Sequence, residues 1–93
     1  MAFFFISSEL QASKVDSLRQ ILSTTIADTT RVSVLNALSK AYCNDNPDTA
    51  VTIGASSRDL AEKIKFKPGL ALALKQMGIA FYLQGKYIDA VNH

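Results

Sequence analysis

Apolar residues recur every three or four positions along most of this chain, and short segments rich in Asn, Asp, Pro and Gly separate the apolar stretches. Spacing of this kind is typical of amphipathic helices. It predicts helices over residues 14–26, 29–44, 47–65, 68–84 and 86–93. The boundaries carry matching signals, because Ser13, Asp28 and Asn46 are N-cap residues and Pro47 and Pro68 suit a first helical position. Gly85 is a natural C-cap before the last helix. The predicted fold class is therefore all-α, with about five helices.

The third of these helices contains the weakest stretch of the pattern. Its expected inner face includes Ala50, Gly54, Ser57 and Ala61, and Gly54 costs about 1 kcal/mol relative to alanine in a helix interior. A short strand over Thr49–Ile53 is the alternative reading. The helix is favoured, because the sequence predicts no second strand for that segment to pair with.

Two parts of the chain share one pattern about 40 residues apart, a distance within the range of helical repeats. The pattern runs large apolar, large apolar, small, aromatic and, later, small again. Its members are Leu35, Leu38, Ser39, Tyr42 and Ala50 in the first unit, and Leu74, Met77, Gly78, Phe81 and Ala90 in the second. In the second unit, Gly78 is expected to let a partner helix approach closely, with Phe81 filling the space beside it. Gly85 and Tyr87 are expected to form the turn between the two helices of that unit.

This pattern resembles the tetratricopeptide repeat, whose units are αα-hairpins stacked into an α-α superhelix. The resemblance divides the chain into an apolar strap or signal remnant (residues 1–13), a leading helix (14–27), a first unit (28–66) and a truncated second unit (67–93). The first unit departs from the family, because Ser39 replaces a glycine and Gly54 stands where the family has a bulky aromatic residue. One hypothesis is that Phe3–Ile6 fills that gap.

The resemblance also implies a function, because the first helix of each unit in this family lines a concave groove that binds a peptide or a partner helix. Carried over by position, the groove residues are Asn36, Lys40, Asn44, Lys75, Ile79 and Tyr82. A plain solvated face is the alternative for Asn36 and Lys40. The apolar residues Leu72, Ile79, Tyr82 and Leu83 form either a partner site or the contact with a following repeat. The expected function is a protein-protein interaction module for a protein or peptide.

The second unit reaches only His93, before its second helix is complete. Stacked repeats bury their faces on their neighbours. We therefore expect either the N-terminal segment of a larger signalling or scaffold protein, or a homodimer in which two copies complete each other. A looser resemblance over Val15–His93, to the N-terminal repeats of Bacteroidetes-type sensor histidine kinases and nucleotide cyclases, favours the first. It leaves the compartment open between cytoplasm and bacterial periplasm, with Phe3–Ile6 as the end of a signal segment in the exported case.

Composition narrows the remaining classes of function. The 93 residues suffice for one small domain, and a net charge of +2 is too small and scattered for a nucleic-acid surface. Cys43 is the only cysteine, which excludes an internal disulfide and a cysteine-rich zinc site. The apolar run at the N-terminus is too short to cross a bilayer. No direct membrane insertion is expected.

Enzyme chemistry is not expected either. His93 is the single histidine, no cluster of metal ligands is apparent, and no glycine-rich phosphate loop or other cofactor motif occurs. Two alternatives to the interaction module remain. One is a self-contained helical chaperone or structural protein that acts as an oligomer. The other is a helical DNA-binding domain using Lys63–Lys67 and Lys75, which lacks the clustered basic residues of a recognition helix.

Overall fold

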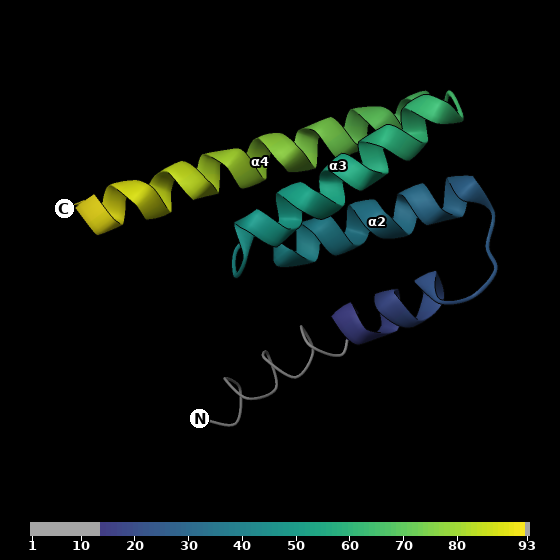
Figure 1. Ribbon diagram of the computed structural model, residues 1–93, viewed down its shortest axis with the longest axis horizontal. Coiled ribbons are helices and arrows are strands. Elements are labelled where there is room, and N and C mark those ends of the chain that lie inside the picture. Colours follow the sequence, from purple (N-terminus) through teal and green to yellow (C-terminus); the bar gives the residue numbers. More distant parts are fainter. Residues whose placement is uncertain (1–13, 93) are drawn as a thin grey trace.

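The computed structural model describes residues 14–92, and the apolar segment over residues 1–13 lies outside that range. Within it, residues 14–22 form a leading helical segment, followed by α2 (Asp28–Tyr42), α3 (Pro47–Lys63) and α4 (Lys67–Asn92) (Figure 1). No residue of the described range is in a strand. The all-α prediction is thus confirmed. The alternative strand over Thr49–Ile53 is wrong, because these residues lie in the first turns of α3.

The three long helices run in alternating directions, with short turns between them (Figure 1). The middle helix, α3, packs against both α2 and α4, and α2 and α4 also contact each other. The leading segment lies beside α2, where Arg19 donates a hydrogen bond of 2.8 Å to the Tyr42 hydroxyl. The C-terminal end of α4 extends well past the ends of α2 and α3 (Figure 1).

Local capping explains where these helices begin and end. Asn46 caps α3 by accepting a hydrogen bond of 3.3 Å from the Thr49 backbone N–H, and Pro47 occupies the first turn. Lys65 ends the same helix in the left-handed conformation, with φ of 57°, and the Phe66 N–H donates back to the Ala61 carbonyl. Asp28 is not an N-cap as predicted, because α2 starts at Asp28 itself, after Ala27.

The leading segment stops at residue 22, four residues before its predicted end. Here the side chains of Ser23 and Thr24 donate hydrogen bonds to the carbonyls of Gln20 and Ile21, at 2.6 and 2.7 Å. Hydroxyl side chains that bond to nearby backbone in this way offer the chain an alternative to further helix.

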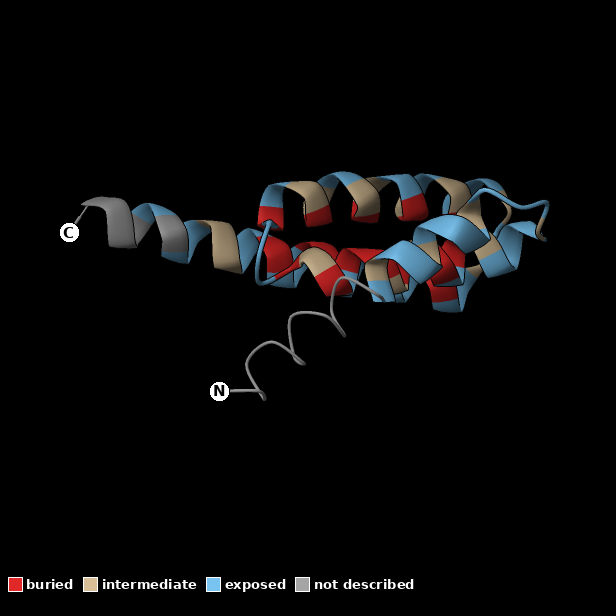
Figure 2. Cartoon of the chain, turned by 90° about the horizontal axis from the view of Figure 1, so that it is seen from below, coloured by how far each residue is buried: buried red, intermediate tan, exposed pale blue. Residues whose placement is uncertain are grey.

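Small side chains line the contacts between the helices, and Figure 2 shows the buried positions facing one another across them. Fully buried positions include Ala50, Ala61, Ala73 and Ala80. A Cβ atom on Gly54 would lie 2.7 Å from Cγ of Met77, and one on Gly69 would lie 2.5 Å from Cγ1 of Val32. These two glycines therefore permit the close approach of α3 to α4 and of α4 to α2.

The close approach predicted at Gly78 is wrong. Gly78 is exposed, and a Cβ atom there would meet no atom within 4 Å. Phe81, which was expected to fill space next to it, is 54% exposed. The buried side of α4 is instead the neighbouring one, which carries Ala73, Met77 and Ala80.

Helix α4 also continues through Gly85, so the predicted turn at Gly85 and Tyr87 and the separate fifth helix are wrong. The apolar spacing runs on in register from Leu74 and Phe81 to Ile88. One interior glycine costs only about 1 kcal/mol, which is not enough by itself to end a helix. The side chains of Tyr87 and Ala90, the other predicted signature residues of this segment, lie outside what is described.

One buried polar group connects all three long helices. Asn36 on α2 is 1% exposed, donates a hydrogen bond of 3.1 Å to the Gly69 carbonyl of α4 and accepts one of 2.6 Å from the Ser57 hydroxyl of α3. Nearby, Ser39 of α2 donates to the Ala50 carbonyl of α3 at 2.7 Å. Buried polar groups with satisfied hydrogen bonds fix the register of a core, because any displacement leaves them unpaired.

We expect Asn36→Ala to lower the free energy of unfolding by about 2–3 kcal/mol, since it removes two buried hydrogen bonds and leaves a cavity where the three helices meet, while Ser57 keeps its hydrogen bond to the Val32 carbonyl. Chemical denaturation measures this loss. Lys40→Ala, one turn further along α2 and exposed, should change the same quantity by less than about 0.5 kcal/mol. Equal effects of the two substitutions would contradict the role of Asn36.

The glycines should fall into two groups on substitution by alanine. Gly69→Ala should destabilise the fold by about 2 kcal/mol, because the new methyl group overlaps the stiff side chain of Val32. Gly78→Ala should stabilise it by about 0.5–1 kcal/mol, because it improves helix propensity in open space. Thermal and chemical unfolding at low protein concentration compares them, and a stabilising Gly69→Ala would refute the close approach.

Candidate interaction surface

Side chains that bind metal ions do not gather in the described part of the chain. No group of three or more His, Cys, Asp or Glu residues there could hold a metal ion. Among residues 14–92, no helix combines the length and the apolar character needed to cross a membrane. The remaining candidates for a functional site are therefore clefts and exposed faces of the described helices.

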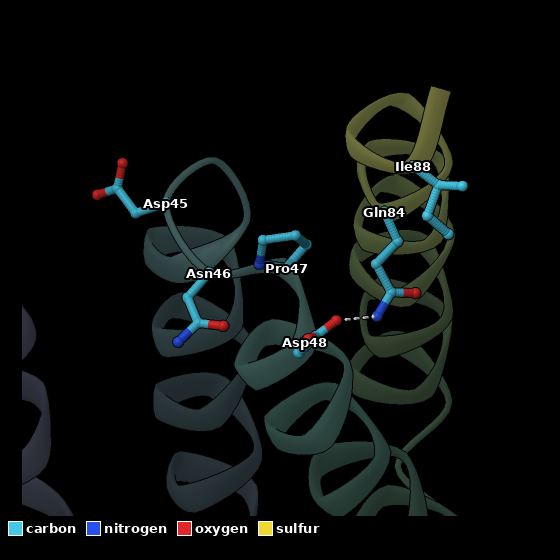
Figure 3. A pocket seen from close by; sticks show the side chains of 6 residues that line it. All are labelled: Asp45, Asn46, Pro47, Asp48, Gln84 and Ile88. Atoms are coloured by element: carbon cyan, nitrogen blue, oxygen red, sulfur yellow. Dashed lines mark hydrogen bonds between the residues drawn. The ribbon is translucent and has the colours of Figure 1, made fainter. Parts of the chain in front are cut away.

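A cleft of about 550 Å³ lies between the α2–α3 turn and α4, lined by Asp45, Asn46, Pro47, Asp48, Gln84 and Ile88 (Figure 3). Its polar groups are largely engaged in holding the helices. Gln84 donates a hydrogen bond of 2.6 Å to the Asp48 carboxylate, Asn46 caps α3, and the Asp45 side chain points away from the others. The sequence did not predict this cleft, because it exists only where α4 runs on past the turn.

A second feature is the surface along the contact between α2 and α4. The two helices meet where Asn36 donates to the Gly69 carbonyl and where the Cys43 thiol donates to the Gln76 carbonyl at 3.9 Å. Close to these contacts in the sequence lie exposed side chains of α4, of α2 and of the turn that follows α2. We call this the α2–α4 surface, and its members are Lys40, Asn44, Leu72, Lys75, Ile79 and Tyr82.

Five of the six residues predicted for the partner groove are thus exposed on the α2–α4 surface. Tyr82 is 63% exposed and Ile79 is 40% exposed. The exception is Asn36, which the core holds through α3 and α4 and which no partner can reach. Its burial had a signal in the sequence, because Asn36 shares helical spacing with the buried residues Val32 and Ser39.

A third feature is an apolar stripe on another side of α4. We call it the Leu74–Ile88 face, and it consists of Leu74, Gly78, Phe81, Gly85 and Ile88. The three large side chains are 51%, 54% and 61% exposed in chain order. Leu74, Gly78 and Phe81 were expected in the contacts of the second repeat unit and Gly85 in its turn, together with Met77, which is indeed buried. The signature residues Leu38 and Ala50 of the first unit are buried as expected, and Leu35 and Tyr42 are half-buried.

Cys43 is the single cysteine of the chain, and its surroundings suppress the reactivity of its thiol. It is 4% exposed, in a cluster with Ala50 and Ala80, and burial raises the pKa of its thiol. The thiolate is the reactive form, so a raised pKa in an apolar site suppresses reaction.

Alkylation of native Cys43 by a maleimide at pH 7.5 should therefore be at least ten-fold slower than in denaturant. Rates followed by mass spectrometry measure this difference. Since the raised pKa favours the neutral thiol in the folded state, stability should also decline as the pH rises above about 8.5, the ordinary pKa of a cysteine. Equal alkylation rates in the native and unfolded protein would show that the thiol is accessible.

Comparison of this chain with models of known protein families, with curated proteins and with solved structures yields no match.

Proposed function

We propose that this protein is an interaction module of tetratricopeptide type that binds a peptide across the α2–α4 surface. The two helices that carry this surface run in the same direction, with α3 packed against both from one side. Short turns join the three helices, as in αα-hairpin repeats. The repeat assignment rests on this arrangement and on the buried first-unit residues Leu38 and Ala50.

One observation carries the proposal: two lysines and three large apolar side chains are exposed together over the contact between α2 and α4. Leu72, Ile79 and Tyr82 are between 40% and 63% exposed, and Lys40 and Lys75 are exposed beside them. Apolar side chains gathered on one exposed side of a small domain mark interaction sites. Basic residues around them favour a partner that carries carboxylates.

The chemistry of these residues indicates the kind of ligand. Lys40 on α2 and Lys75 on α4 would pair with acidic side chains or a terminal carboxylate. Leu72 and Ile79 would cover apolar side chains of the peptide between them. Tyr82 is held from one side, because the Lys86 ammonium lies 5.1 Å from the centre of its ring. The proposed ligand is therefore an extended peptide that combines acidic and apolar residues.

The same proposal extends to the wider role. A module that binds peptides, and that performs no catalysis of its own, fits a segment of a larger signalling or scaffold protein. Neither a cofactor nor nucleic acid enters this role. The cleft beside α4 is not part of this proposed role, since Gln84 and Asp48 bond to each other across it and Asn46 caps α3.

Selection of peptides from a random display library on the immobilised protein tests the proposal. Enriched sequences should combine acidic and apolar residues. Tyr82→Ala and Lys40→Ala should each weaken binding of an enriched peptide at least ten-fold in fluorescence anisotropy, because an interface depends on a few aromatic and charged anchors.

Two substitutions outside the surface serve as controls. Lys63→Ala removes an exposed lysine from the end of α3, and Phe81→Ala removes an exposed aromatic residue from the Leu74–Ile88 face of α4. Both should leave the peptide affinity within about two-fold. The proposal fails if the library yields no binding sequence, or if the controls weaken binding as much as Tyr82→Ala and Lys40→Ala do.

A further inference from the structure

The Leu74–Ile88 face has a regular internal pattern. Its five residues are separated by four, three, four and three positions, which is the spacing of the two core positions in a coiled-coil heptad. One core position is always large, with Leu74, Phe81 and Ile88. The other is always glycine, with Gly78 and Gly85. A Cβ atom on either glycine would meet nothing within 4 Å, so both glycine positions are open to the outside.

We infer that this face pairs with the same face of a second copy of the chain, with the two α4 helices antiparallel. In that register Phe81 lies opposite Gly85 of the second copy, and Ile88 lies opposite Gly78 of the second copy. A two-fold axis repeats each contact, so the layers from Gly78 to Ile88 each combine a large side chain with a glycine, and Leu74 lies opposite position 92 of the second copy. Alternation of large and small residues across facing positions lets two helices interdigitate at short distance.

A parallel pairing of the same faces fits less well. It sets Phe81 against Phe81 of the second copy and Gly85 against Gly85. The two large side chains would then overlap, and the two glycines would leave an empty space between the helices. Close packing without voids is what stabilises an interface core. The pattern therefore favours a second copy as the occupant, in the antiparallel arrangement. Only in that arrangement do the large residues of one copy lie opposite the glycines of the other.

The area available makes this a weak dimer. Leu74, Phe81 and Ile88 are about half exposed, and burying them removes roughly 300 Å² per copy if a side chain of this size offers about 200 Å². With the glycine backbones and flanking residues, the pair would bury roughly 1,000 Å² in total, at the low end for specific interfaces. We expect dissociation in the micromolar range.

The dimer and the peptide site are carried by different main contacts. The Leu74–Ile88 face lies on a different side of α4 from Leu72 and Ile79, whereas Tyr82 lies at the border of both surfaces, one helical turn from Gly78 and from Gly85. Failure of the dimer would leave the peptide proposal intact, and the reverse also holds.

Sedimentation equilibrium of the full chain between about 1 µM and 1 mM tests the inference. The native sequence should change from monomer to dimer in this range. Gly85→Leu should weaken the dimer at least ten-fold, because the new side chain fills the space that Phe81 of the second copy enters. Phe81→Ala should weaken it to a similar extent. Neither substitution should lower the helical circular dichroism of the monomer, since both positions are exposed.

A compensating variant and a control complete the test. Phe81→Ala combined with Gly85→Leu exchanges the large and small positions, so it should recover most of the affinity that either change removes. Lys86→Leu adds an exposed leucine beside the face without filling a glycine position, and should change the dissociation constant by less than about three-fold. A chain that remains monomeric at 1 mM overturns the inference and leaves the face to a different protein. A dimer that Gly85→Leu tightens, that the double variant fails to restore, or that Lys86→Leu weakens equally overturns it as well.

Discussion

The contact between Asn36, Ser57 and Gly69 is the constraint on which the rest of this fold depends. One amide with 1% exposure bonds to α3 and α4 from a position on α2, so the register of each long helix is fixed relative to the other two. The contact is possible only because Gly69 brings the α4 backbone close to α2, next to Val32. The hydrogen bond from Asn36 and the absence of a side chain at Gly69 thus together fix the position of α4 against α2.

Close packing of this kind determines which residues are left outside. Where helices approach through glycine and alanine, the space between them has no room for Leu74, Phe81 or Tyr82, which are therefore more than half exposed. Most of the large hydrophobic residues that are exposed in the described part of the chain therefore lie on α4. The exposed faces of α4 are therefore a direct result of how the core is built, and both surfaces proposed for binding follow from it.

The sequence predicts most of the local structure, because the signals that set helix ends are local. Asn46 and Pro47 define the start of α3 as expected, and the buried positions of Ala50, Gly54 and Ser57 follow from the helical spacing. Long-range facts were beyond the pattern. The spacing of Asn36 with Val32 and Ser39 indicates that it is buried, but not that its partners are Ser57 and Gly69. A glycine such as Gly85 is compatible both with a turn and with an uninterrupted helix. The partner positions Lys40, Lys75 and Ile79 were predicted from the resemblance and are exposed, whereas their ligand stays a proposal.

The composition of the core also affects how the stability of this protein depends on temperature. The heat capacity increment of unfolding grows with the apolar area that becomes exposed and falls with the polar area. Contacts built from alanine, glycine, serine and asparagine expose less apolar area per residue than a core of leucine and phenylalanine would. The increment should therefore lie below the usual 12–15 cal/mol/K per residue. A small increment flattens the curve of stability against temperature, so the fold loses little stability on cooling, and its modest maximum extends over a broad range of temperature.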